Sequence, residues 1–149
     1  DEARAVPLRQ VADRYFARPG MLKDATRDLM DWHIEEVFGK WKDRPIASIT
    51  PAEVRKRYEE IATKGLRGKK AAPSSAGLAM MTLRTLCNWA RAEYRLADGT
   101  PILTMNPVEV LKKDLKPAPP RTRHIDRRQI GNFWHWITTA RKSPALNAD

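Results

Sequence analysis

Residues 74–96, SSAGLAMMTLRTLCNWARAEYRL, form the longest uninterrupted helical pattern in the chain. At 100° per residue, its apolar side chains gather on one side of the segment. They are Leu78, Ala79, Leu83, Leu86, Cys87, Trp89, Ala90 and Tyr94. An apolar arc this wide predicts a central helix against which several other helices pack.

A narrow basic stripe lies on the opposite side of this expected helix. Its residues recur at intervals of three or four and are Arg84, Asn88, Arg91 and Arg95. We expect Ser74 or Ser75 to cap the start of the helix, where free N–H groups also attract phosphate. The stripe therefore predicts an edge that binds an anion, and the alternative is an edge that only faces water.

The segment before this helix, GLRGKK at residues 65–70, is basic and rich in glycine. It contributes Arg67, Lys69 and Lys70 next to the expected helix start. The loop, the helix start and the stripe are contiguous in sequence. Together they predict a row of phosphate contacts beside a helix that can enter a major groove.

The overall charge supports a polyanionic partner. The 149 residues carry a net charge of +10, with a pI of about 10.1. Residues 1–65 hold 13 basic and 12 acidic side chains, whereas residues 66–149 hold 15 basic and 6 acidic ones. The surplus therefore lies in the second half, and such a surplus is typical of proteins that bind nucleic acid.

Candidate catalytic and metal-binding residues are few. The single cysteine, Cys87, excludes a disulfide within the chain and is expected to be a core residue in a reducing cytoplasm. His33, His124 and His135 lack the spacing of a metal site, and His33 is expected to be a core histidine. We predict no cofactor, no metal site and no membrane span.

The other patterns are helical too, and no strand pattern is present. Helices are expected at residues 6–17, 21–38, 51–64 and 108–115, the third opened by a Thr50–Glu53 capping box. The buried side of the second helix is expected to comprise Leu22, Thr26, Leu29, Met30, His33 and Val37. The prediction is an all-α fold, a compact bundle of four to five helices.

Residues 116–124 form a basic segment with three prolines, which predicts a linker after a first domain of residues 1–115. Beyond it, Asp126 and Gln129 suit the start of another helix. That helix has an apolar face of Ile130, Phe133, Trp134 and Ile137. We interpret residues 125–149 as the start of a further, truncated domain, and the chain as an excised fragment.

The order of several short motifs is specific. The motifs are LRQVADRYF at 8–16, ITPAEV at 49–54, LAMMTLRTLCNWA at 78–90, NPV at 106–108 and HIDRRQI at 124–130. In this order they resemble the N-terminal core-binding (SAM-like) domain of phage-type tyrosine recombinases, the integrases. The resemblance covers about residues 8–137, with HIDRRQI at the entrance to the catalytic domain.

The resemblance implies that this domain and a catalytic domain clamp the double-stranded DNA of a recombination site. Contacts would come from the basic loop and the central helix, with linker arginines on phosphates: Arg67, Lys69, Lys70, Ser74, Ser75, Arg84, Arg91, Arg121 and Arg123. Where family members often carry an Asn-Arg pair, this chain has Ala79-Met80-Met81. The family's catalytic Arg, Lys, His and Tyr set is absent from the matched region, so the fragment is not expected to be an enzyme.

The resemblance further implies a full-length recombinase that is tetrameric on DNA, in the cytoplasm of a bacterial host and associated with its nucleoid. The fragment alone is expected to be monomeric. Two other classes stay open, a DNA-binding regulator and a helical module that binds an acidic protein. A salt titration that compares binding to duplex DNA with binding to an acidic protein would distinguish these classes.

Overall fold

The computed structural model describes residues 5–20, 22–114 and 129–140. The chain divides into two compact units, Asp1–Ala118 and Pro119–Asp149. The predicted linker, with Arg121 and Arg123, lies outside the described residues, as do His124 and Asp126. Each unit is therefore considered by itself, and the first contains all the described residues of the candidate site.

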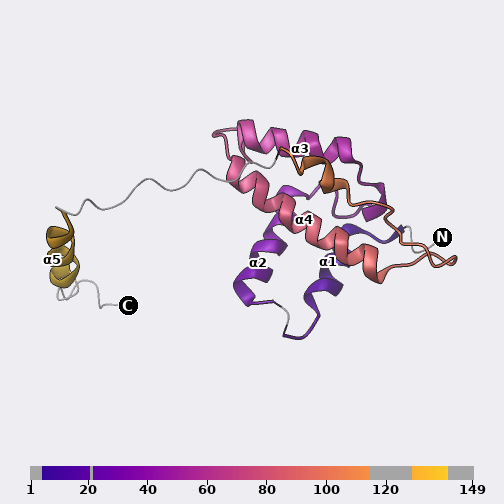
Figure 1. Cartoon of the computed structure of the whole chain (residues 1–149), viewed down its shortest axis with the longest axis horizontal. Helices are drawn as coiled ribbons and strands as arrows, with labels where there is room; N and C mark the ends of the chain where they lie inside the picture. Colours follow the sequence, from indigo (N-terminus) through magenta and orange to yellow (C-terminus); the bar gives the residue numbers. More distant parts are fainter. Residues whose placement is uncertain (1–4, 21, 115–128, 141–149) are drawn as a thin grey trace. The chain divides into compact units, whose positions relative to one another are not determined.

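The described elements are helical, which confirms the predicted all-α class (Figure 1). In the first unit they are α1 (Leu8–Phe16), α2 (Asp24–Trp32), η2 (His33–Val37), η3 (Ile46–Ser48), α3 (Pro51–Lys64), α4 (Pro73–Glu93) and η4 (Pro107–Leu111). The second unit contains α5 (Ile130–Ala140). Among the described residues, β-type pairing is limited to the isolated bridges Pro7–Pro45 and Arg95–Pro101.

Helix α4 is the centre of the first unit. It contacts α1, η2, α3 and η4, as predicted for the helix with the widest apolar arc. Its buried residues are Ala76, Ala79, Met80, Thr82, Leu83, Leu86, Cys87 and Ala90. Leu78 was expected in this arc, but 46% of its surface is exposed. The reason is that Leu78 lies about 140° around the helix from Leu83, the middle of the buried sector.

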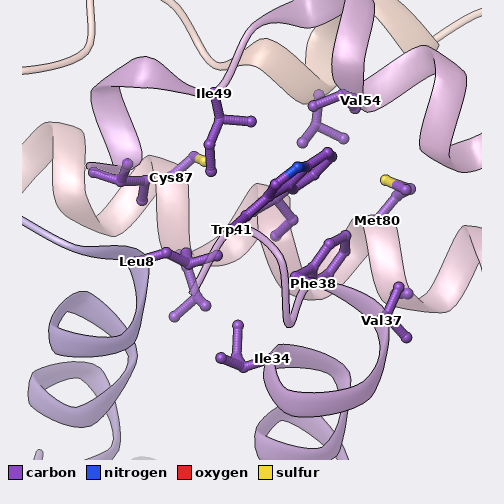
Figure 2. Packing of buried hydrophobic residues seen from close by; sticks show 14 of the residues in the cluster. Leu8, Ile34, Val37, Phe38, Trp41, Ile49, Val54, Met80 and Cys87 are labelled. Carbon is purple, nitrogen blue, oxygen red and sulfur yellow. The ribbon is translucent and has the colours of Figure 1, made fainter. Parts of the chain in front are cut away.

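Two stacked aromatic rings fill the space between the connector after η2 and the surrounding helices (Figure 2). The ring centroids of Phe38 and Trp41 are 5.5 Å apart, and the ring planes meet at 16°. Figure 2 shows Ile49, Val54 and Met80 around these rings, so residues far apart in sequence share one core. Trp41 therefore closes its loop onto the core through the large apolar area that it buries.

The second helix differs from its prediction. Helix α2 ends at Trp32 and continues as the π-helical turn η2, whose extra residue per turn shifts the buried face. His33, Ile34 and Val37 are consequently buried. Thr26 and Leu29, expected to be buried, are exposed, because α2 itself buries only Met30 and extends away from the core (Figure 1).

The start of α3 agrees with its prediction. The Thr50 hydroxyl accepts a hydrogen bond from the Glu53 amide at 3.3 Å, and the Thr50 amide donates to the Glu53 carboxylate at 3.0 Å. Arg44 also donates to Glu53, at 2.8 Å. The segment expected as a helix at 108–115 is instead the short 3₁₀ helix η4, opened by the Asn106 side chain and Pro107.

Candidate nucleic-acid interface

One backbone carbonyl closes the basic loop, which comprises residues 65–72. The amides of Gly65 and Ala72 both donate to the carbonyl of Ile61, at 2.9 and 3.2 Å. The loop between them thus leaves the end of α3 and returns to the start of α4 in a fixed path. It presents Arg67, Lys69 and Lys70, and all three are exposed.

Gly65 makes this closure possible. Its φ of 75° lies in a region that other residues rarely adopt, and a Cβ atom there would lie 1.9 Å from the carbonyl oxygen of Lys70. The backbone of Lys70 therefore folds back onto Gly65. Lys69 and Lys70 are placed beside the start of α4 by backbone geometry, and their side chains remain free to contact a ligand.

The predicted cap of α4 is wrong. Ala72 takes the N-cap position without a side-chain hydrogen bond, because Pro73 occupies the first helical position. Ser74 and Ser75 are displaced into the first turn, where both are exposed. Among the described residues, their backbone amides have no backbone acceptor, and such amides at a helix N-terminus are suited to bind phosphate.

The predicted stripe is exposed along α4, at Arg84, Asn88 and Arg91. Asn106 packs beside it, and its side-chain amide donates to the carbonyl of Arg84 at 2.9 Å and to the Asn88 side chain at 2.8 Å. The Asn106 side-chain oxygen also accepts from the amide of Val108 at 3.0 Å. Buried Asn106 therefore fixes η4 against the stripe, a role that the Asn-Pro pattern alone did not indicate.

Several cations of the first half are paired with carboxylates, whereas those of the basic loop and of α4 are not. In the first half, carboxylates form salt bridges with Arg9, Arg27, Lys42, Arg44, Arg55 and Arg57. No carboxylate in the described part of the chain pairs with Arg67, Lys69, Lys70, Arg84 or Arg91. We call these five side chains the open cations. Their charge is available to an external anion.

Arg95 differs from the open cations. It follows the end of α4, and its guanidinium donates to the carbonyl of Gly99 at 3.4 Å. It is thereby associated with the turn after the helix. Arg121 and Arg123 cannot be placed in the same way, because they lie outside the described residues.

The length of α4 determines how the open cations can act together. At 1.5 Å per residue, Ser74 and Arg91 are about 25 Å apart along the helix. A B-DNA major groove is about 12 Å wide. Helix α4 is thus about twice as long as a groove is wide, so the loop at one end and Arg91 at the other are separated by more than the width of a groove.

Other chemistry finds little support in the described residues. No group of three or more His, Cys, Asp or Glu side chains there could hold a metal ion. All three tyrosines take part in packing: Tyr15 and Tyr94 contact the Trp89 ring edge to face, and the Tyr58 hydroxyl donates to the carbonyl of Asp114 at 3.4 Å. No helix in the same residues is long and apolar enough to cross a membrane.

The chain matches no known protein family, no curated protein and no solved structure. The surface made by the loop at 65–72 and the outward side of α4 is the feature that the described residues define best, and we call it the basic surface.

Proposed function

We propose that this chain is a DNA-binding domain that contacts duplex DNA through the basic surface. The observation that carries the proposal is the set of five open cations on one loop and one helix, whereas the other arginines that the structure describes are paired or packed. Exposed cations without carboxylate partners attract phosphate and release its counterions, which favours binding to DNA.

In this proposal the two ends of the basic surface position the domain on the duplex. Lys69, Lys70 and the free amides of Ser74 and Ser75 contact one phosphate backbone, and Arg91 contacts the other. The middle of α4 then lies in the major groove, where Arg84 can reach a guanine through its planar fork. Phosphate contacts supply most of the affinity, and groove contacts supply the sequence preference.

The ordered motifs suggest which kind of DNA-binding domain this is. Their resemblance to the core-binding domain of phage-type tyrosine recombinases leads us to propose the same role, one half of a clamp around a recombination site. Strand cleavage then belongs to the catalytic domain of the full-length protein, which would act in the cytoplasm as a tetramer on DNA. We expect the chain alone to bind DNA as a monomer without cleaving it.

The proposal is tested by fluorescence anisotropy with a labelled duplex of mixed sequence at low salt. Replacing both Lys69 and Lys70 with alanine should weaken binding about tenfold, which is about 1.4 kcal/mol. The matched control replaces Lys40 and Lys56, two other exposed lysines without salt bridges, which line one hollow with Glu36, Glu53 and Glu60. That control should change the dissociation constant less than twofold.

Circular dichroism must show that both double variants remain folded. Equal losses of DNA affinity in the Lys69/Lys70 variant and in the Lys40/Lys56 control would mean that binding depends on net charge and not on the basic surface. No binding by the unaltered chain would contradict the proposal directly. Tighter binding to an acidic protein than to DNA would favour a protein-interaction module instead.

A further inference from the structure

Large apolar side chains are exposed on α2 and on α4, close in sequence to the contact that η2 makes with α4. The exposed fractions are 41% for Leu29, 45% for Trp32, 46% for Leu78 and 60% for Met81. In sequence they lie four residues or one residue before His33 and before Thr82. The Nδ1 atom of His33 and the hydroxyl oxygen of Thr82 are 2.8 Å apart in a buried contact. Leu29 and Trp32 come from the α2 side of this contact, and Leu78 and Met81 from the α4 side.

The α4 half of this group lies within the basic surface. Met81 is three residues before Arg84 and seven after Ser74, so all three share the outward side of the helix. Leu78 is about one turn before both Met81 and Thr82, the residue that contacts His33 of η2. Exposed apolar side chains that lie between the open cations of the loop and those of α4 fit a ligand that offers both apolar groups and negative charge.

The α2 half is less suited to DNA. Asp28 is exposed beside Leu29, and it forms no salt bridge with any described residue. A carboxylate at this position repels phosphate and keeps α2 at the border of a groove. Leu78 and Met81 are therefore the members of this group that suit contact with DNA.

We propose that Leu78 and Met81 contact the C5-methyl groups of thymines in the major groove, so that the domain prefers sites rich in A·T pairs at the middle of α4. The inference rests on the proposed function and specifies its ligand. Thymine presents a methyl group in the major groove, and the other three bases do not. The unbranched methionine side chain can adapt its shape to such a small apolar target.

The spacing along α4 fits this assignment. Leu78 and Met81 are about 4.5 Å apart along the helix axis, close to the 3.4 Å rise of one base pair along a strand. The two side chains can therefore contact neighbouring base pairs. Arg84, another turn along, follows the same groove toward a third pair, while the cations at both ends hold the phosphates.

Replacing thymine with deoxyuridine tests the assignment, because the exchange removes only the methyl group. We compare a hairpin duplex of alternating A and T with the same duplex of A and U, by anisotropy at one low salt concentration. The unaltered chain should bind the thymine duplex about fourfold more tightly per contacted methyl, equivalent to ~0.8 kcal/mol. Met81→Ala and Leu78→Ala should each reduce this ratio and leave affinity for the uridine duplex nearly unchanged.

Met105→Ala is the matched control, since Met105 is 51% exposed but lies outside α4. This variant should keep the full thymine-to-uridine ratio. Equal binding of both duplexes by the unaltered chain, with strong salt dependence, would overturn the methyl contact and leave DNA binding intact. No binding of either duplex would overturn both proposals.

Analytical ultracentrifugation tests whether a second copy of the chain, and not DNA, covers this surface. The proposal expects a monomer at all concentrations used for binding, both for the unaltered chain and for Met81→Ala. A dimer that Met81→Ala converts to monomer would overturn it, because the apolar side chains would then be covered by a second copy of the chain.

Discussion

The Nδ1 atom of His33 and the hydroxyl oxygen of Thr82 are 2.8 Å apart in the buried contact between η2 and α4. Only 2% of His33 and 6% of Thr82 is exposed. Burial lowers the pKa of His33, so the folded protein favours the neutral ring. This pair attaches η2, into which α2 continues, to the central helix α4.

Thr82→Val should destabilise the fold by about 1–3 kcal/mol, because a buried ring nitrogen of His33 loses its hydrogen-bond partner while the shape of the side chain is kept. Urea denaturation measures the change. Thr85→Val is the control on the same helix: Thr85 is exposed, and its hydroxyl donates only to the carbonyl of Met81. Equal effects of the two substitutions would contradict the importance of the His33–Thr82 pair.

Acid should weaken the start of α3 through Glu53. The hydrogen bond from Arg44, followed by that from the Thr50 amide, lowers the pKa of Glu53 from 4.5 to about 2. The folded state therefore favours the carboxylate, whose contribution is complete above about pH 4.5 and is lost as the pH falls toward 2.

Glu53→Gln should consequently cost about 1 kcal/mol at neutral pH and much less near pH 2. The cost is small because 35% of the Glu53 side chain is exposed and water screens its pair with Arg44. Thermal melts at several pH values give the difference. Glu59→Gln is the control, since Glu59 is exposed without a salt bridge among the described residues. A pH-independent cost at Glu53 would contradict the interpretation.

Cys87 should be inert until the protein unfolds. Burial raises the pKa of its thiol to about 12, and none of its surface is exposed. Because the thiolate is the reactive form, a thiol reagent at mildly alkaline pH should label the native chain very slowly. Labelling should become fast in concentrated guanidinium chloride. Rapid labelling of the native chain would mean that α4 is not the closed centre of the fold.

Gly65→Ala should distort the basic loop, because its Cβ atom would collide with the carbonyl of Lys70 and its φ is positive. We expect a loss of about 1–3 kcal/mol in stability, together with weaker DNA binding. Gly68→Ala is the matched control: its φ is also positive, at 70°, but nothing lies within 4 Å of the added atom. Equal effects at both glycines would show that loop closure at Gly65 does not position Lys69 and Lys70.

Periodicity and capping chemistry were enough to predict much of the fold. The buried arc of α4 follows from residues spaced three and four apart, and the start of α3 follows from Thr50, Pro51 and Glu53. The π-helical turn at His33–Val37 could not be predicted in this way, because one added residue shifts the face without changing composition. The cap of α4 was misassigned because Pro73 has a stronger preference than serine for the first helical position.

The candidate site was predicted only in part. Charge asymmetry pointed to Arg67, Lys69 and Lys70, and helical spacing pointed to Arg84 and Arg91. Neither signal shows whether a carboxylate lies nearby, which is decided by contacts between segments distant in sequence. Helical spacing alone would have placed Met81, three residues before Arg84, on the exposed side where the structure has it.

The most direct test of the central claim is the salt dependence of binding to duplex DNA. If Arg67, Lys69, Lys70 and Arg91 contact phosphates and Arg84 lies in the groove, log K should fall against log salt with a slope of about −3 to −4, at about 0.9 per phosphate contact. Replacing Lys69 and Lys70 with alanine should reduce the magnitude of the slope by about 2, and replacing Lys40 and Lys56 should leave it unchanged. A slope near zero, or the same reduction from both pairs, would contradict DNA binding through the basic surface.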